Sequence, residues 1–441
     1  MKISFFINKV IVFLLGKNLF SEDIQKVSQG VRKTINIQAA SYLIVFLSNI
    51  IMVRVAGIKE YGIFINIINW ISLLSIVASQ GMEDVVLAEI PPRIAKGNFT
   101  GAFGVINFAN RIIIIGAVLT CLLFILILFT GYISVFTQYQ PLFFAALINV
   151  YLMSFVAVNQ QALQAYNKFY KSQLADRLVK PLFYLVVLTV FLLLKVKAGA
   201  GLLINLTTIA QLTGAIMIYF FLRQIATIKD ENIFQKKKEN TLSYSSPNFY
   251  FFIISMLYLL KAKIAVIIFG FEVSSENTGI FNILCRLADF VILPVFIIHS
   301  IVPQLFSHHL EAEKSYKKEL YKKITRLITA GALIIFIFIV IGGKFILELY
   351  GNSFVQYYGL LIALAASQLL YSFFGPSSAF LMMQGRQKQA AFVLLADIII
   401  SFFLFIIFIR EYGLAGGVWA TFISALLYNI ILRVMVNKII R

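Results

Sequence analysis

Residues 258–293 decide the fold, and they read YLLKAKIAVIIFG (258–270), FEVSSENTG (271–279) and IFNILCRLADFVIL (280–293). Two apolar runs flank a short polar turn, a pattern typical of two helices that cross a bilayer. Lys261, Lys263, Arg286 and Asp289 are charged residues inside the apolar runs. At roughly 1.5 Å of rise per residue, Lys261 and Arg286 lie about 14 Å from the turn, near the middle of a hydrocarbon layer of roughly 30 Å. A charge there costs on the order of 2.5–3.5 kcal/mol, so it marks a candidate functional site.

The composition extends this pattern to the whole chain. Of its 441 residues, 60% are hydrophobic and 13% charged, the mean hydropathy is +0.90 and the formal net charge is +19. These values exclude a water-soluble globule, and continuous apolar runs of about twenty residues exclude an outer-membrane barrel. We therefore predict an all-α polytopic membrane protein. Its positive charge is interpreted as topological Lys and Arg, with no nucleic-acid partner, and its Cys and His lack the spacing of a metal site.

Hydropathy and turn signals predict twelve transmembrane spans, at residues 34–55, 61–82, 107–129, 141–162, 173–194, 200–222, 246–269, 279–303, 325–347, 357–381, 391–409 and 414–436. Most of the 38 Lys and Arg fall in the N-terminus, the connections after even-numbered spans and the C-terminus. By the positive-inside rule both termini are cytoplasmic. The predicted parts are a cytoplasmic segment at 1–33 that suits an in-plane helix or a disordered leader, six-helix lobes at 34–222 and 246–441, and a cytoplasmic linker at 223–245.

The two predicted lobes resemble each other. Gly62-Ile63-Phe64 opens span two and Gly279-Ile280-Phe281 opens span eight, while Gln164 and Asp176 near span five recur as Gln384 and Asp397 near span eleven. Six spans per lobe make this a parallel repeat, an arrangement of transporters that rock two bundles around a central cavity near the midplane. Chance similarity between apolar segments is the alternative.

Polar residues share helical faces in several spans. Span one carries Gln38, span two Asn66 and Asn69, span seven Ser255, Tyr258 and Lys261, and span eight Asn282, Arg286 and Asp289. They either line a transport path or bond helices to one another. Lys263 is two residues from Lys261 and points away from it, so we expect Lys261 to face the interior.

The charges of spans seven and eight have two interpretations. Arg286 and Asp289 could pair within one helix and need no ligand. Lys261 and Arg286 carry two positive charges and Asp289 carries one negative charge, so the three residues have a net positive charge. This charge favours binding of an anionic group such as a phosphate. Without a nucleotide-binding loop, coupling to H⁺ or Na⁺ or to the substrate gradient is expected, with Asp289, Glu83 and Asp397 as candidate coupling carboxylates. No other cofactor is expected.

Three stretches resemble the polysaccharide flippases of the multidrug/oligosaccharidyl-lipid/polysaccharide exporter superfamily. They are EYGIFINIINWISLLSIVASQGMEDVV (60–86), KAKIAVIIFG (261–270) with NTGIFNILCRLADFVILPVFIIHSIVPQLFS (277–307), and FLMMQGRQKQ (380–389) with YGLAGGVWATFIS (412–424). Arg286 matches a basic position common in span eight of these proteins, whereas Lys261 departs from their usual acidic or polar residue.

This resemblance implies a function. It implies an undecaprenyl-diphosphate-linked oligosaccharide, such as an O-antigen or capsule repeat unit, moved from the cytoplasmic to the outer leaflet of a bacterial inner membrane by alternating access. The implied partners are this substrate, membrane lipids, and a polysaccharide polymerase or other assembly proteins. A multidrug exporter is the alternative within transport. A membrane glycosyltransferase or polysaccharide polymerase would need a catalytic loop or acidic cluster that the sequence does not show.

Overall fold

The computed structural model describes residues 40–130, 138–229, 248–295 and 314–440. These residues form helices joined by short turns, with no strand among them, so the all-helical prediction is confirmed. Contacts divide the described chain into two units, one up to Lys263 and one from Ile264 onward. The boundary falls inside α12 (Asn248–Glu272). The predicted segment 1–33 lies before the described residues, and the predicted linker 223–245 is described only as far as Lys229.

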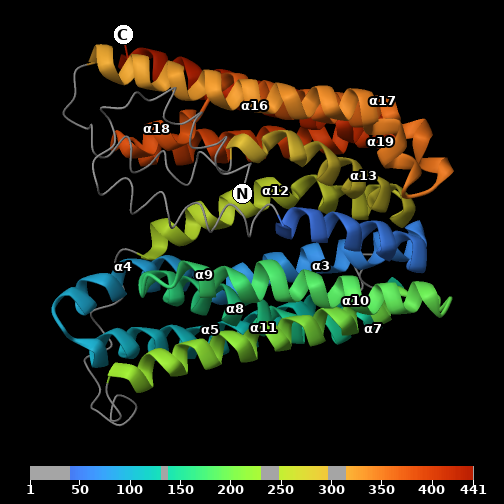
Figure 1. The fold of residues 1–441 in the computed structure, drawn as a ribbon. Helices are drawn as coiled ribbons and strands as arrows, with labels where there is room; N and C mark the ends of the chain where they lie inside the picture. Colours follow the sequence, from blue (N-terminus) through green and yellow to red (C-terminus); the bar gives the residue numbers. More distant parts are fainter. Residues whose placement is uncertain (1–39, 131–137, 230–247, 296–313, 441) are drawn as a thin grey trace. The chain divides into compact units, whose positions relative to one another are not determined.

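The N-terminal unit is a bundle of helices that run side by side (Figure 1). It begins with the helix Ala40–Ala56 and continues with α3 (Ile58–Ser79), α4 (Met82–Ala95), α5 (Phe99–Thr130), α7 (Gln140–Ala146), α8 (Ile148–Ala165), α9 (Phe169–Gln173), the π-helical turn η2 (Leu174–Val179), α10 (Lys180–Leu193), α11 (Ala200–Lys229) and the first part of α12.

The C-terminal unit is also built of helices (Figure 1). It contains the rest of α12, then α13 (Ser275–Ala288), the 3-10 helix η4 (Asp289–Ile292), α16 (Lys314–Glu348), the 3-10 helix η5 (Asn352–Tyr357), α17 (Tyr358–Phe374), α18 (Ser377–Met383) and α19 (Gln387–Ile440). Gly413 has non-helical backbone angles, φ 54° and ψ −127°, so α19 consists of two helices that meet at this residue.

Each of the twelve predicted spans overlaps helix in the described part of the chain, and span ten, predicted at 357–381, is interrupted at Gly375 and Pro376 between α17 and α18. Eight of the described helical segments are long and apolar enough to cross a membrane. Span two ends earlier than predicted, at Ser79, because Gln80 and Gly81 adopt left-handed backbone angles and start the separate helix α4. Spans eleven and twelve, predicted at 391–409 and 414–436, are the two parts of α19 on either side of Gly413.

The helices of the N-terminal unit pack closely. A Cβ on Gly116 of α5 would lie 2.2 Å from the backbone oxygen of Ala78 in α3, so these helices touch through their backbones. Ser154 of α8 donates to the backbone oxygen of Ser75 in α3 at 2.6 Å. Glu60 of α3 accepts from the first backbone N–H of α11 at 2.8 Å, which satisfies one of its orphan donors. Small residues and short polar bonds are typical of helix contacts in lipid.

The C-terminal unit is held by an aromatic stack and a tight hairpin. The rings of Phe269 in α12 and Phe281 in α13 stack with centroids 4.3 Å apart. Gly417 of α19 lies against this stack, because a Cβ there would be 2.2 Å from the Phe269 ring. A Cβ on Gly416 would lie 1.8 Å from the backbone oxygen of Phe408, so the two parts of α19 touch directly at their turn.

Large apolar side chains cover the outside of both units. In α16 Ile341 is 80% exposed, and Phe338 and Phe345 are also exposed. Leu119, Leu123 and Leu126 are exposed in the same way on α5. Such surfaces far exceed what a soluble monomer exposes, so they are faces for lipid tails.

Candidate functional site

The helix α13 carries the charges that the sequence singled out in span eight. Its start is fixed by Ser274, whose side-chain oxygen accepts from the backbone N–H of Asn277 at 3.3 Å. Its apolar face, with Ile280 and Phe281, is buried in the C-terminal unit. This packing fixes the rotation of α13 about its axis and therefore the direction in which its polar residues point.

Asn282, Arg286 and Asp289 form a polar line along α13 and η4. Asn282 is buried, and its side-chain oxygen accepts from Nε of Arg286 at 2.9 Å. Arg286 is exposed, as is Asp289, which accepts from Nε2 of Gln368 in α17 at 2.9 Å. Asn282 thus orients a guanidinium whose other N–H groups point away from this bond, an arrangement that suits binding of an anion.

Arg286 and Asp289 make different hydrogen bonds, the first within α13 and the second to a neighbouring helix. Arg286 bonds to Asn282, one turn before it. The helix tightens to a 3-10 turn at Asp289, where Asp289 meets Gln368 of the neighbouring α17. Gln368 was missed by the sequence analysis, because nothing in a polar residue of span ten indicates a partner in span eight.

Lys261 and Tyr258 lie in the part of α12 that belongs to the N-terminal unit, whereas Arg286 belongs to the C-terminal unit. Lys261 and Lys263 are both half-buried, and Tyr258 is exposed. The structure therefore does not single out Lys261 over Lys263, and the expected pairing of Lys261 with Arg286 stays a prediction. The side chain of Ser255 lies outside the described part of α12.

Asn66 and Asn69 are buried inside the N-terminal unit, at 4% and 3% exposure. Among the described residues, neither the side-chain oxygen of Asn66 nor the side-chain nitrogen of Asn69 has a hydrogen-bond partner. Buried amides are usually satisfied, so these groups are suited to water or a polar ligand. Gln38 precedes the first described residue.

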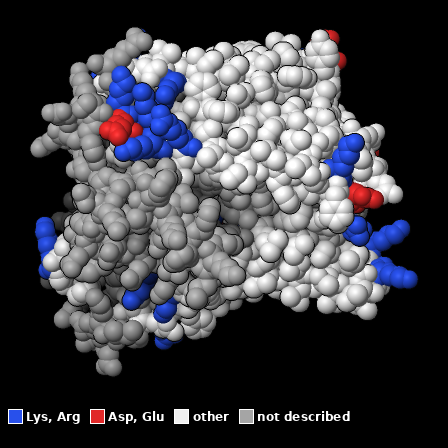
Figure 2. All heavy atoms as spheres, turned by 45° about the horizontal axis from the view of Figure 1, so that its top comes forward, with Lys and Arg blue, Asp and Glu red and all other residues white. Residues whose placement is uncertain are grey.

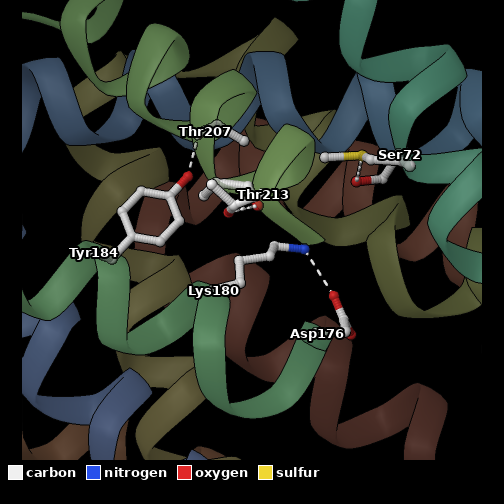
Figure 3. Close-up of polar contacts among 8 residues, drawn as sticks. Ser72, Asp176, Lys180, Tyr184, Thr207 and Thr213 are labelled. Carbon is white, nitrogen blue, oxygen red and sulfur yellow. Dashed lines mark hydrogen bonds and ion pairs between the residues drawn. The ribbon is translucent and has the colours of Figure 1, made fainter. Parts of the chain in front are cut away.

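Further polar contacts tie spans of the N-terminal unit together (Figure 3). Lys180 pairs with Asp176 at 2.8 Å across one turn, and the hydroxyl of Tyr184 bonds to that of Thr207 in α11. The spacing of Asp176 and Lys180 could have predicted their ion pair. No sequence signal points to the bond between Tyr184 and Thr207, because it depends on how α10 packs on α11.

Asp397 is a buried carboxylate of the C-terminal unit. It is 4% exposed and accepts from Ser424 at 3.1 Å, and Ser424 also bonds to Ser401 at 2.7 Å. The sequence repeat aligns Asp397 with Asp176, which has Lys180 beside it. The two carboxylates of the repeat therefore differ in chemistry: one forms an ion pair and the other accepts from the hydroxyl of Ser424.

Glu83 lies in the first turn of α4, just beyond the end of span two, and accepts from Ser79 at 3.0 Å. Burial raises the pKa of its carboxyl above the usual value of 4.5. Hydrogen bonds from its own backbone N–H and from Ser79 oppose this rise in pKa, and the negative charge of Asp84 adds to it. Glu83 therefore holds its proton to higher pH than an exposed glutamate.

We expect the stability that this proton supports to be lost as pH rises. It is fully present below the usual pKa of 4.5 and disappears as pH passes through the raised folded-state pKa. Glu83→Gln removes the ionisation, so its unfolding temperature should rise relative to wild type between pH 4.5 and 8, measured by thermal unfolding in detergent. Glu276→Gln, at an exposed carboxyl, is the control. If the difference in unfolding temperature between Glu83→Gln and wild type stayed the same across this pH range, the raised pKa would be contradicted.

Within the described residues, no group of three His, Cys, Asp or Glu side chains is arranged to hold a metal ion. His299, His308 and His309 lie in 296–313, outside those residues. The polar sites of the described chain therefore consist of an oriented arginine, buried amides and buried or half-buried carboxylates.

Solved structures with this fold are membrane transporters. An inward-facing multidrug resistance MATE family transporter of the MOP superfamily matches with a TM-score of 0.73 and 13% identity, over 90% of this chain and 94% of that one. The lipid II flippase MurJ, in an inward closed conformation, matches with a TM-score of 0.67 and 14% identity, over 91% and 86%. An outward-facing MATE family transporter of the MOP superfamily matches with a TM-score of 0.61 and 14% identity, over 93% and 96%.

The likeness covers nearly the whole chain in each case, although identity is low. No family model matches the sequence, and no curated protein matches it. The structural comparison supports the fold that the sequence resemblance implied. The chain has the fold shared by these MATE family transporters and the lipid II flippase MurJ.

Proposed function

We propose that this chain is a flippase that moves a lipid-linked oligosaccharide, joined to its lipid through a diphosphate, across a bacterial inner membrane. Two kinds of support converge on this proposal. The fold is shared with a lipid II flippase and with multidrug transporters. The sequence adds cationic residues inside apolar spans, in a chain with a net charge of +19.

The orientation of the exposed Arg286 guanidinium is the observation that carries the proposal. Arg286 is exposed within an apolar stretch, and Asn282 holds its Nε at 2.9 Å, so the remaining N–H groups are presented in a fixed direction. A planar guanidinium with free N–H groups binds phosphate oxygens in pairs. A diphosphate is the part of a lipid-linked sugar that this arrangement recognises. Lys261, Asn66 and Asn69 stay predicted substrate contacts, on the sequence pattern alone.

The transport cycle we propose is alternating access, with the diphosphate held by Arg286 while the sugar crosses and the lipid tail stays in the bilayer. The coupling ion would be H⁺ or Na⁺. Among the candidate carboxylates, Asp289 is exposed and bonded to Gln368, Glu83 holds a proton to raised pH, and Asp397 is buried with Ser424. Asp397 is the best placed, since hydroxyl groups and a buried carboxylate bind either ion.

Replacing Asp397 with Asn should uncouple transport from the ion gradient. The substitution keeps the shape and an acceptor for Ser424 but removes the charge that H⁺ or Na⁺ would neutralise. Transport into proteoliposomes should then proceed at the same rate with and without a proton or sodium gradient. Glu411→Gln, at an exposed carboxylate near the turn of α19, should respond to the gradient as wild type does. A normal response of Asp397→Asn would exclude Asp397 as the coupling group.

A reconstitution experiment tests the proposed function directly. Purified protein in proteoliposomes is given a fluorescent oligosaccharide on undecaprenyl diphosphate, and a lectin that cannot cross the membrane reports the labelled sugar in the outer leaflet. We expect protein-dependent flipping of this lipid and no lengthening of the oligosaccharide. Protein-dependent efflux of ethidium without flipping would identify the multidrug exporter alternative. A lengthened sugar chain would identify a polymerase or glycosyltransferase.

The setting we propose follows from the same reasoning. Both termini would be cytoplasmic, and the flipped substrate would be handed to a polysaccharide polymerase or other assembly protein on the outer face. Protease accessibility of tags at the two ends of the chain, in sealed membrane vesicles of known orientation, checks the topology.

A further inference from the structure

Arg433, near the end of α19, is fixed on an aromatic surface. Its guanidinium carbon lies 4.7 Å from the centre of the Tyr321 ring in α16. Tyr321 is 1% exposed, and its hydroxyl is held by the backbone oxygen of Phe374 and, at 2.7 Å, by the hydroxyl of Ser377. Because the ring cannot move, stacking on it pre-orients the guanidinium.

Two buried N–H donors, one on the residue that stacks on this ring and one at the end of α18, have no acceptor among the described residues. They are Nη1 of Arg433 and Nε2 of Gln384. Phe380 of α18 packs edge-on against Tyr321 with ring centroids 5.5 Å apart, and Gln384 follows Phe380 by one turn. A buried donor without an acceptor costs free energy, so an acceptor other than the described residues is expected here.

Positive charge gathers at the start of α16, the helix that carries Tyr321. Lys318, Lys322 and Arg326 are exposed at the start of α16, and Lys318 lies three residues before Tyr321 on the same helical face. Glu319 pairs with Lys323 at 2.7 Å, which leaves the excess positive. Figure 2 shows Lys and Arg atoms gathered at one end of this face around a small acidic group, with uncharged atoms over its middle. An excess of positive charge at this end of α16 favours an anionic acceptor.

We propose that this end of the C-terminal unit binds the phosphate of an anionic phospholipid, with Arg433 as the main ligand and Gln384 and Lys318 as supporting donors. Phosphate fits because a guanidinium fork matches its paired oxygens. A phospholipid fits because the donors lie at the ends of apolar helices, where headgroups lie. Basic pockets between helices on the cytoplasmic side bind such headgroups, and the positive-inside rule predicts that side for this end.

This site is separate from the proposed transport site. Arg286 lies within an apolar stretch on α13, whereas Arg433 lies near the last residues of α19 and stacks on the start of α16. A resident phospholipid would tie α16, α18 and α19 together at the membrane surface. Its loss should therefore lower thermal stability without removing a group from the transport path.

Native mass spectrometry of the full-length protein with phosphatidylglycerol, phosphatidylethanolamine and undecaprenyl diphosphate tests the proposal. Wild type should retain phosphatidylglycerol at least about tenfold more than phosphatidylethanolamine, and Arg433→Gln should lose most of this preference. Arg433→Lys keeps the charge but not the fork, so an intermediate loss is expected. It also serves as the folded comparison if Arg433→Gln unfolds.

The matched control is Arg326→Gln, which removes the same charge from an exposed position of the same basic end. We expect it to weaken phosphatidylglycerol retention by no more than about twofold, the size of a screened surface effect. Equal losses in Arg433→Gln and Arg326→Gln would overturn the site in favour of diffuse attraction. Unchanged retention in both Arg433 variants would also overturn it, as would binding of undecaprenyl diphosphate alone.

Discussion

Arg286→Ala should reduce flipping of a diphosphate-linked oligosaccharide by about tenfold to a hundredfold, because hydrogen bonds to a charged group contribute about 1.5–3 kcal/mol each. The substitution removes the guanidinium that Asn282 orients at 2.9 Å and leaves the buried face of α13 unchanged. In cells that depend on this protein, surface polysaccharide should disappear while the protein remains in the membrane at normal level. Sugar flipping in proteoliposomes gives the rate directly.

Two further variants distinguish specific binding of the diphosphate by the Arg286 guanidinium from a general effect of positive charge on transport. Arg286→Lys keeps the charge without the paired N–H groups, so it should restore only part of the rate. Arg410→Gln removes a 63% exposed arginine that pairs with Glu272 at 2.7 Å, and transport should stay near wild type because exposed ion pairs contribute little. Full flipping by Arg286→Ala at normal protein level would show that the diphosphate is bound elsewhere.

Gly116→Ala should strongly destabilise the N-terminal unit. The added Cβ would lie 2.2 Å from the backbone oxygen of Ala78, and neither backbone can move aside without separating α5 from α3. Overpacking of this kind costs about 1–3 kcal/mol, and more when both neighbours are backbone. Thermal unfolding of the purified protein in detergent should show a clear decrease in unfolding temperature.

Gly104→Ala is the matched control in the same helix. A Cβ at Gly104 would meet no atom within 4 Å, so only the helix propensity changes. Alanine is favoured over glycine inside a helix by roughly 0.5–1 kcal/mol, and the variant should be as stable as wild type or slightly more stable. If the two variants unfolded at the same temperature, the backbone contact between α3 and α5 would not be a determinant of stability.

The positions of the spans were predictable because lipid imposes a simple rule: long apolar runs must satisfy their own backbone as helices. The early end of span two was not predictable in detail, since the left-handed angles at Gln80 occur in a residue with no glycine-like signal. Gly413 was recognisable as a turn, because it separates two apolar runs and is followed by the pair Gly416-Gly417.

The site was predictable as a set of residue types but not as a set of contacts. Helical spacing placed Asn282 and Arg286 on one face, and they are bonded. The partner of Asp289, Gln368, comes from another helix, so only packing reveals it. The same holds for Arg433 on Tyr321, where a basic residue at the end of a span was indistinguishable from a topology signal.

The hairpin at Gly413 also bears on how the chain enters the membrane. A lone helix that carried Asp397 in its apolar stretch would expose an unshielded carboxylate to lipid, which is unfavourable. Ser424, which bonds to Asp397 at 3.1 Å, lies in the next helix. The turn at Gly413 brings the backbones of the two helices into contact. The last two helices can therefore leave the insertion machinery as a pair, with the polar group already shielded before either one reaches lipid.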